Sequence, residues 1–137
     1  MRYVDDADIN ARDVLHPEVD RLTGRQLHFE NVVVMMAETD VISATNLDIH
    51  LEGGNDGPAR LFRNGQVFSI TWSTQGDEYE DQTGLRRPIR FLNPDGSPAA
   101  LSPGSTWVII VTPFSAFEPQ GGGKYMVRYA PPAGEDQ

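Results

Sequence analysis

Histidine is the side chain best suited to acid–base chemistry near neutral pH, and the sequence contains three. His16 and Asp20 lie four residues apart, and a carboxylate beside an imidazole can orient it as a general base. Pro17 follows His16 directly and prevents a regular helix from carrying both side chains on one face. The pair therefore depends on a loop, and a local hydrogen bond and a ligand or metal contact both stay open as interpretations.

Named motifs for nucleotide binding and nucleophilic catalysis are missing from the sequence. Neither G-x-G-x-x-G nor G-x-x-x-x-G-K-[ST] occurs, and the glycine run at 121–123 has neither the spacing nor a following helix. The G-x-S-x-G elbow of serine hydrolases is also missing, and the chain has no cysteine. Disulfides, thiolate metal sites and a cysteine nucleophile are thereby excluded. We expect no catalytic residue, no cofactor and no metal.

Two further groups of polar residues could hold an ion, but a solvated surface explains each of them. Asp48, His50 and Glu52 alternate along a predicted strand at steps of roughly 7 Å, too far apart for one ion unless a neighbouring strand helps. The acidic run at 77–81 offers carboxylates to Ca²⁺ but lacks the glycine spacing of an EF-hand loop. We expect both groups to be ordinary surface.

Aromatic and arginine side chains supply the remaining binding candidates. Trp72 and Trp107 lie in predicted strands, where burial is the default, although either could be a stacking platform for a sugar ring. Arg86 and Arg87 adjoin a polar loop in an acidic protein. They are the place to look for a contact with an anion or a carboxylate.

Length and charge limit the classes of protein that remain. The 137 residues suffice for one domain around one core, and the formal net charge is −9. Such a charge disfavours nucleic acid, which attracts proteins through Lys and Arg. The longest apolar runs, 32–37 and 107–111, are far shorter than the roughly 20 residues that span a bilayer, so we expect no membrane insertion.

Short apolar segments separated by Gly, Pro, Asn and Asp clusters predict an all-β fold. We expect six to eight strands in a small, mostly antiparallel sandwich or partly open barrel. At most one short N-terminal helix fits, at 5–15, and Pro17 would end it. Residues 1–129 are expected to form this single domain and 130–137 a disordered tail.

The strongest local signal is a hairpin around Asn64-Gly65, a pair that favours a type I′ turn. Its two-residue loop predicts a register in which Ala59, Leu61, Phe68, Ile70 and Trp72 share the core-facing side.

Other segments are predicted from their alternation and turn residues. The runs at 30–38 and 106–112 are apolar on both faces and indicate two central strands. Strict alternation at 47–52 predicts a half-exposed strand with Leu47, Ile49 and Leu51 inward.

Polar stretches divide the second half of the chain. The stretch at 73–87 indicates an exposed loop or irregular hairpin, followed by a short strand at 88–92 and a β-turn at 93–96. A flexible loop is expected at 118–123 and a last strand at 124–129.

Two short blocks of residues carry a family resemblance. The first contains His16, Asp20, Thr23-Gly24, Gln26-Leu27 and the run at 31–34, and the second is the run at 103–108. With Gly65, Trp72 and the turn at 93–96 between them, residues 15–113 resemble the C-terminal domain of the DUF3048 family. The family usually has a basic residue two positions after this tryptophan, where the present sequence has Thr74. This departure weakens the idea of a basic ligand contact at that position.

The resemblance implies a domain of unknown function from a bacterial protein that is typically two-domain and exported or membrane-anchored. It implies an extracytoplasmic location, with an anchor in a part of the protein outside this sequence, and it transfers no catalytic residue. The leading hypothesis is a non-enzymatic module for a cell-envelope ligand, a protein partner or its own N-terminal domain. The alternatives are a hydrolase of envelope polymer with a His16/Asp20 acid–base pair, and a structural spacer. The candidate binding residues are His16, Asp20, Asn31, Trp72, Arg86 and Arg87.

Overall fold

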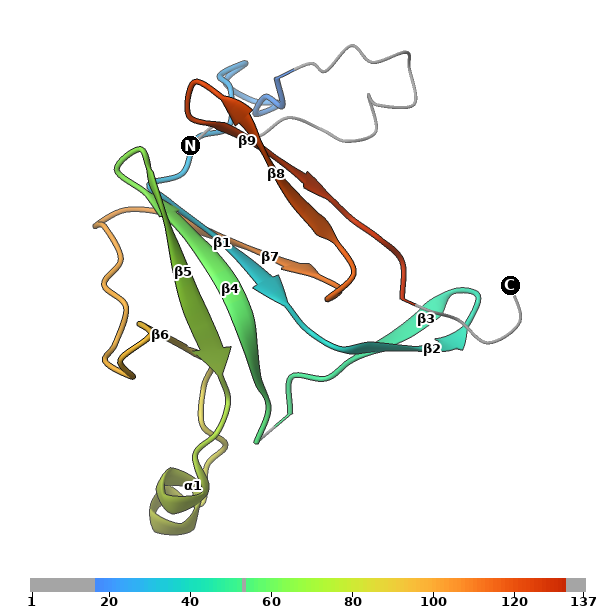
Figure 1. Cartoon of the computed structure of the whole chain (residues 1–137), viewed down its shortest axis with the longest axis vertical. Coiled ribbons are helices and arrows are strands. Elements are labelled where there is room, and N and C mark those ends of the chain that lie inside the picture. The colour runs from blue at the N-terminus through green and yellow to red at the C-terminus, as the bar shows by residue number, and fades with distance from the viewer. Residues whose placement is uncertain (1–16, 53, 133–137) are drawn as a thin grey trace.

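The computed structural model describes residues 17–52 and 54–132, which form short strands and one helix (Figure 1). The elements are β1 (Asn31–Met36), β2 (Thr39–Ser43), β3 (Asn46–Ile49), β4 (Asp56–Arg63), β5 (Gln66–Ser73), α1 (Asp77–Thr83), β6 (Arg90–Leu92), β7 (Thr106–Val111), β8 (Ala116–Gly121) and β9 (Lys124–Arg128). The all-β prediction is confirmed. The described residues contain nine strands, one more than the expected maximum, and no sheet closes into a barrel.

A five-stranded sheet in the order β6-β5-β4-β1-β7 is the body of the fold. Its pairs are antiparallel except that β1 and β7 run parallel. Two separate hairpins, β2–β3 and β8–β9, complete the strands. No helix in the described part of the chain is long and apolar enough to cross a membrane.

The predicted hairpin is confirmed as β4–β5. Arg63 pairs with Gln66, Phe62 with Val67 and Leu61 with Phe68. Asn64 and Gly65 have φ angles of 49° and 71°, as a type I′ turn requires.

Both faces of the sheet bury apolar side chains. One face holds the main core, whose buried members are Val33, Met35, Ala37, Ala59, Leu61, Ile70 and Trp72. The other face carries Val34, Phe62 and Val111, and the β8–β9 hairpin packs Phe117 and Val127 against them. β1 therefore has neighbours on both edges and cover on both faces, as its apolar run predicts.

The second apolar run, β7, lies at the edge of the sheet, so the prediction of a second central strand is wrong. Its apolar pattern has another cause. Ile110 packs on the main core, while Ile109 and Val111 belong to the cluster beneath β8–β9. Two-sided burial therefore comes from the layers above and below, while Val108 stays 42% exposed.

The expected half-buried strand at 47–52 is also corrected. β3 ends at Ile49 and pairs only with β2, and the hairpin projects from the sheet (Figure 1). Leu47 and Ile49 are therefore exposed, whereas Leu51 packs against the main core. Alternation predicted a strand correctly, but no second layer covers its apolar side.

The loop or irregular hairpin expected at 73–87 contains the short helix α1 instead. Asp77, Glu78 and Glu80 occupy its first turn, where negative charge favours a helix, and Gly84 ends it with φ 68°. Similarly, the flexible loop expected at 118–123 lies mostly in β8, and the turn to β9 uses glycines with positive φ.

The β-turn at 93–96 is confirmed, with the Gly96 N–H donating to the Asn93 carbonyl at 2.9 Å. The short strand before it, β6, and the last strand, β9, also occur where expected. The expected helix at 5–15 lies outside the described residues, as does most of the expected tail, 133–137.

Candidate functional site

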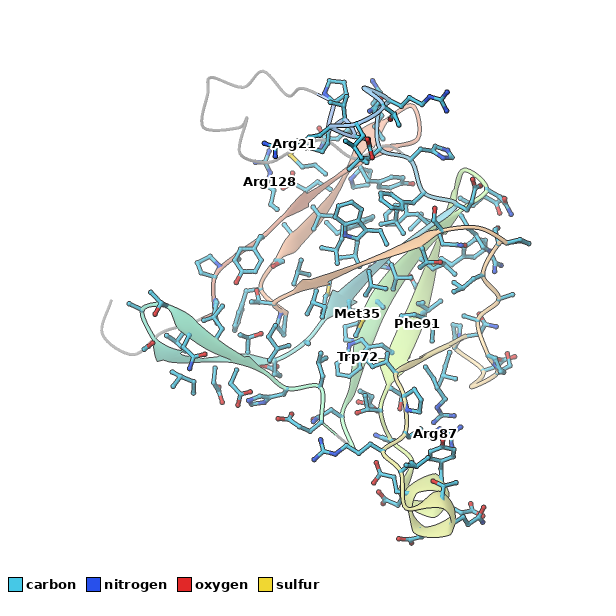
Figure 2. The ribbon with its side chains drawn as sticks, turned by 180° about the vertical axis from the view of Figure 1, so that it is seen from behind. Arg21, Met35, Trp72, Arg87, Phe91 and Arg128 are labelled. Atoms are coloured by element: carbon cyan, nitrogen blue, oxygen red, sulfur yellow. The ribbon has the colours of Figure 1, made fainter. Side chains whose placement is uncertain are left out.

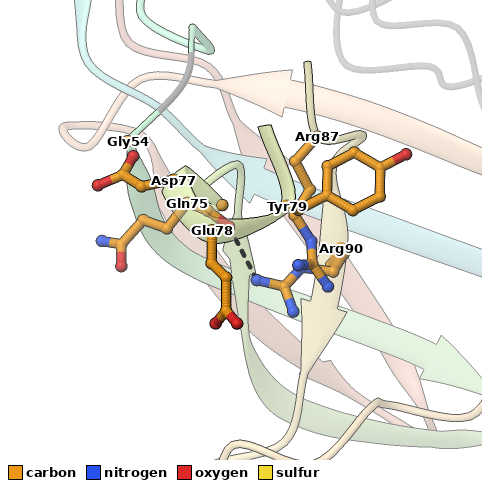
Figure 3. Close-up of a pocket in the computed structure, with 8 residues that line it drawn as sticks. Gly54, Gln75, Asp77, Glu78, Tyr79, Arg87 and Arg90 are labelled. Atoms are coloured by element: carbon orange, nitrogen blue, oxygen red, sulfur yellow. Dashed lines mark hydrogen bonds between the residues drawn. The ribbon is translucent and has the colours of Figure 1, made fainter. Parts of the chain in front are cut away.

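A shallow cleft of about 400 Å³ opens beside α1, where the chain leaves β5 and later enters β6 (Figure 3). Two glycines line it together with six polar residues, which are Gln75, Asp77, Glu78, Tyr79, Arg87 and Arg90. Figure 3 shows Asp77 and Gln75 on one side, Arg87, Arg90 and Tyr79 on the other, and Glu78 between them. Because charged groups of both signs share it, the cleft suits a polar ligand.

Gly76 permits the close packing of Arg87 at this cleft. A Cβ atom placed on Gly76 would lie 2.3 Å from Cδ and 2.7 Å from Cβ of Arg87, distances that real atoms do not tolerate. The Gly76 backbone is extended, so its value here is the space it leaves rather than unusual geometry. The arginine stem thus crosses the glycine directly.

Tyr79 and Glu80, both on α1, fix Arg87 from the other side. The guanidinium carbon lies 5.1 Å from the centroid of the Tyr79 ring, and the backbone N–H of Arg87 donates to Glu80 Oε1 at 3.3 Å. Stacking over a ring restrains the plane of a guanidinium but leaves its edge N–H groups free to donate. Arg87 is therefore oriented before any ligand arrives.

Arg90, at the start of β6, is the second cation of the cleft. Its Nη2 donates to the Gln75 carbonyl at 2.9 Å, shown as the dashed line in Figure 3. Its Nε is buried and has no acceptor among the described residues. A buried donor without an acceptor typically costs about 1–3 kcal/mol, so an acceptor supplied by a ligand would relieve this position.

The carboxylates of Asp77 and Glu78 line the same cleft, yet no ion pair within 4 Å joins them to Arg87 or Arg90 in the described structure. Glu78 accepts a hydrogen bond from Gln82 at 3.2 Å, one turn along α1. Two positive and two negative groups therefore face one space without neutralising each other directly.

The structure separates the two arginines selected from the sequence. Arg87 lines the cleft, whereas Arg86 is exposed and does not line it. Arg90 was missed because it falls within a predicted strand. The available signal was a third arginine three positions after Arg87, within the short strand predicted at 88–92.

Trp72 is buried to 1% exposure, and its indole Nε1 donates to the Met36 carbonyl at 2.7 Å. Asn31 is fully buried at the start of β1. It accepts from the Ser102 N–H and donates to the Ser102 carbonyl, each at 2.8 Å. The structure thus places both residues inside the protein, where they join distant segments, and neither lines the cleft.

Asp20 closes a surface turn. Its Oδ1 accepts the Thr23 and Leu22 N–H groups at 2.8 and 2.7 Å, and these bonds lower the pKa of the Asp20 carboxyl below 3.8. His16 lies outside the described residues, so its pairing with Asp20 stays a prediction.

The polar residues of the β2–β3 hairpin form one local contact. His50 Nε2 lies 2.9 Å from Asp40 Oδ2 and 3.9 Å from Asp48 Oδ2. Glu52 takes no part in these contacts. Neither this hairpin nor the acidic helix α1 gathers three ligating side chains, and the same holds throughout residues 17–52 and 54–132.

Comparison with known proteins identifies the class. The family model for the C-terminal domain of DUF3048, a protein of unknown function, matches residues 10–108, and the chain belongs to this family. The family prediction from the sequence is thereby confirmed, with the match beginning and ending five residues earlier than expected.

A solved structure supports the same assignment. The crystal structure of the YerB protein from Bacillus subtilis is similar, with a TM-score of 0.55 and 27% sequence identity. The alignment covers 73% of the present chain but only 30% of YerB. No curated protein sequence matches the chain.

Proposed function

We propose that this chain is a non-enzymatic ligand-binding module of an exported, envelope-associated bacterial protein, and that the cleft beside α1 holds the ligand. The observation that carries the proposal is the pair of guanidinium groups in that cleft, one oriented on Tyr79 and one with a buried Nε lacking an acceptor in the described structure. Guanidinium groups are the preferred partners of carboxylates and other planar oxyanions.

Preorganisation favours binding at this cleft over the other candidates. The Tyr79 ring and the Gln75 carbonyl already restrain the two guanidinium groups, and Glu80 fixes the backbone of Arg87, so binding loses less side-chain freedom. By contrast, the polar atoms of Trp72 and Asn31 bond to the protein itself.

The cellular part of the proposal rests on what the resemblance to the DUF3048 family implies, since members of that family are typically exported or membrane-anchored. We place the protein outside the cytoplasm, anchored to the membrane by a part outside this sequence, with its own N-terminal domain as a further partner. Fractionation of cells producing the full-length protein tests this, because a soluble cytoplasmic protein would contradict it.

Retention of envelope fragments tests the binding function. The immobilised chain is incubated with an enzymatic digest of the bacterial envelope, and retained molecules are identified by mass spectrometry. We expect the wild-type chain to retain a discrete set that the double variant Arg87→Gln/Arg90→Gln does not. Equal retention by both would overturn the assignment to the cleft. Conversion of fragments into products would instead favour the hydrolase with a His16/Asp20 pair.

A second function, docking of a protein partner, is favoured by the β2–β3 hairpin. Val41 pairs with Leu47, and Ile49 follows on the same face, so three apolar side chains lie together with 37–47% exposure. An isolated two-stranded hairpin is marginally stable in water, and exposed apolar clusters often mark interaction sites.

Site-specific cross-linking tests this docking function in cells. A photoreactive residue at Leu47 of the full-length protein should give one discrete cross-linked species, whereas the same residue at Leu85, an exposed position after α1, should not. Identical patterns from both positions would contradict docking, and the domain would then act as a spacer at this surface.

A further inference from the structure

We infer that the ligand of the cleft is a zwitterion, a small molecule or chain end that carries a carboxylate and an ammonium group close together. This inference rests on the proposed function and adds the chemical class of the ligand. Free α-amino acids and the ends of short peptides share this chemistry. The argument depends on the charges lining the cleft, on the net charge of the protein and on the fixed positions of the arginines.

The charges in the cleft balance. Arg87 and Arg90 supply two positive groups, and Asp77 and Glu78 supply two negative groups, all lining one opening (Figure 3). In the described structure these four groups form no ion pair with one another. A ligand with one positive and one negative group can contact both kinds, whereas a simple anion would face the two carboxylates.

The charge of the whole chain points the same way. With a formal net charge of −9, the protein repels free anions at a distance, and binding to a cleft with no net charge would not compensate for this. A zwitterion has no net charge and approaches without that penalty. It then gains local, charge-assisted hydrogen bonds at both of its ends.

The geometry of α1 supports a fixed arrangement of the two signs. Asp77 and Glu78 begin the helix, while Arg87 is held against the same helix through Tyr79 and Glu80. The side chains seen from behind in Figure 2 show Arg87 close to α1 and remote from Trp72 in the core. The two carboxylates and Arg87 are thus held at one small helix, while Arg90 is held beside it at the start of β6 by the Gln75 carbonyl.

Four related probes, two with both charged ends and two with only one, test the inference by NMR titration of the whole chain at pH 7. They are alanine, N-acetylalanine, alaninamide and alanylalanine. We expect saturable amide shifts at 76–79, 87 and 90 with alanine or alanylalanine, at a dissociation constant on the order of 1–10 mM. N-acetylalanine and alaninamide, which each lack one charge, should bind at least about tenfold more weakly. Tighter binding of alanine indicates a free amino acid, and tighter binding of alanylalanine a peptide end.

Variants identify the groups that read each charge. Arg90→Gln should lower the affinity for the zwitterion at least about tenfold. Arg86→Gln, one residue from the cleft lining, should leave that affinity unchanged. Glu78 is exposed on α1, so Glu78→Gln should leave the fold intact. This substitution should lower the affinity for alanine, because it removes a carboxylate that contacts the ammonium group. The affinity for N-acetylalanine should stay equal or rise, because the same carboxylate repels an anion.

Two results would overturn the inference. If N-acetylalanine binds as tightly as alanine, the cleft takes a simple carboxylate, and the proposed binding function stands without the zwitterion. If none of the four probes gives saturable shifts, the zwitterion is also rejected. Retention of envelope fragments by the wild-type chain but not by Arg87→Gln/Arg90→Gln then still decides the proposed function separately.

Discussion

The five-stranded sheet and the two elements that project from it, the β2–β3 hairpin and α1, obey the same local rules but differ in burial. β4–β5 and β2–β3 are both antiparallel hairpins with apolar residues on one side. β4–β5 has β1 and β6 beside it and buries its apolar side in the main core, whereas β2–β3 has no third strand. Alternation therefore specifies a strand, and neighbouring elements decide whether it is buried.

Under the proposed function, this difference separates the residues that support the fold from the residues that bind a ligand or a partner. Residues of the sheet such as Trp72 and Asn31 are occupied by contacts within the protein. The projecting elements carry the charged cleft and the exposed apolar cluster. Substitutions in the sheet should thus affect the free energy of unfolding, and substitutions on the projections should affect binding.

The largest expected effect is at the core of the sheet. Trp72→Ala should lower the free energy of unfolding by about 3–5 kcal/mol, because it removes a buried ring and leaves the Met36 carbonyl without its donor. Leu47→Ala, on β2–β3, should lower it by less than about 1 kcal/mol because Leu47 is 47% exposed. Urea denaturation measures both, and similar losses would break the comparison.

The next effect concerns two asparagines that each begin a strand, Asn31 in β1 and Asn46 in β3. Asn31→Ala should cost about 1–3 kcal/mol, because the N–H and carbonyl of Ser102 lose their partner in a partly buried site. Asn46→Ala, at the exposed start of β3, should cost less than about 0.5 kcal/mol. Thermal unfolding distinguishes them, and an equal shift of Tm would show that Asn31 is not a structural clamp.

A smaller effect on stability, but a large one on binding, is expected at Gly76. Gly76→Ala should displace the Arg87 side chain, because the added methyl group occupies the space of the arginine stem. The affinity for the ligand should fall at least about tenfold as a result. Thr45→Ala, on the tip of β2–β3, is the matched control. The titration with alanine and alanylalanine measures binding. Unchanged affinity in Gly76→Ala would show that the position of Arg87 is irrelevant.

The smallest effect is a pH response at the surface turn of Asp20. Hydrogen bonds from Thr23 and Leu22 lower the pKa of this carboxyl in the folded protein. The ionised carboxyl therefore stabilises the fold at any pH above its pKa in the unfolded chain, and this stabilisation is lost as the pH falls through the lowered pKa of the folded protein. The amide resonances of Leu22 and Thr23 should therefore shift below about pH 4, the ordinary aspartate range. Asp20→Asn should abolish the response. A titration midpoint of the two amide shifts above pH 3.8 would contradict a lowered pKa for Asp20.

The sequence was most informative where a local rule and a packing rule agreed. Asn64-Gly65 determines a turn by its φ angles, and the side chains flanking it bury on the predicted face. The position of β7 could not be predicted in this way. Its apolar residues show burial on both faces but do not reveal whether a strand or solvent lies at its outer edge.

The site was predicted only in part, for related reasons. Arg87 was selected because a basic residue in an acidic, polar stretch is unusual, and the cleft includes it. Arg90 and the helix that faces it were not found, because seven residues with no buried side chain leave no apolar periodicity to detect. Trp72 was a candidate by residue type and Asn31 through the family resemblance, and neither source reveals that their polar atoms bond internally.

Two adjacent arginines provide the most direct test of the assignment of binding to the cleft. The envelope fragment that the wild-type chain retains most tightly is titrated calorimetrically into Arg87→Gln and Arg86→Gln. Because only Arg87 lines the cleft, we expect its variant to lose at least about tenfold in affinity and the Arg86 variant to match the wild type. Equal losses in both variants, or none in either, would contradict binding at this site.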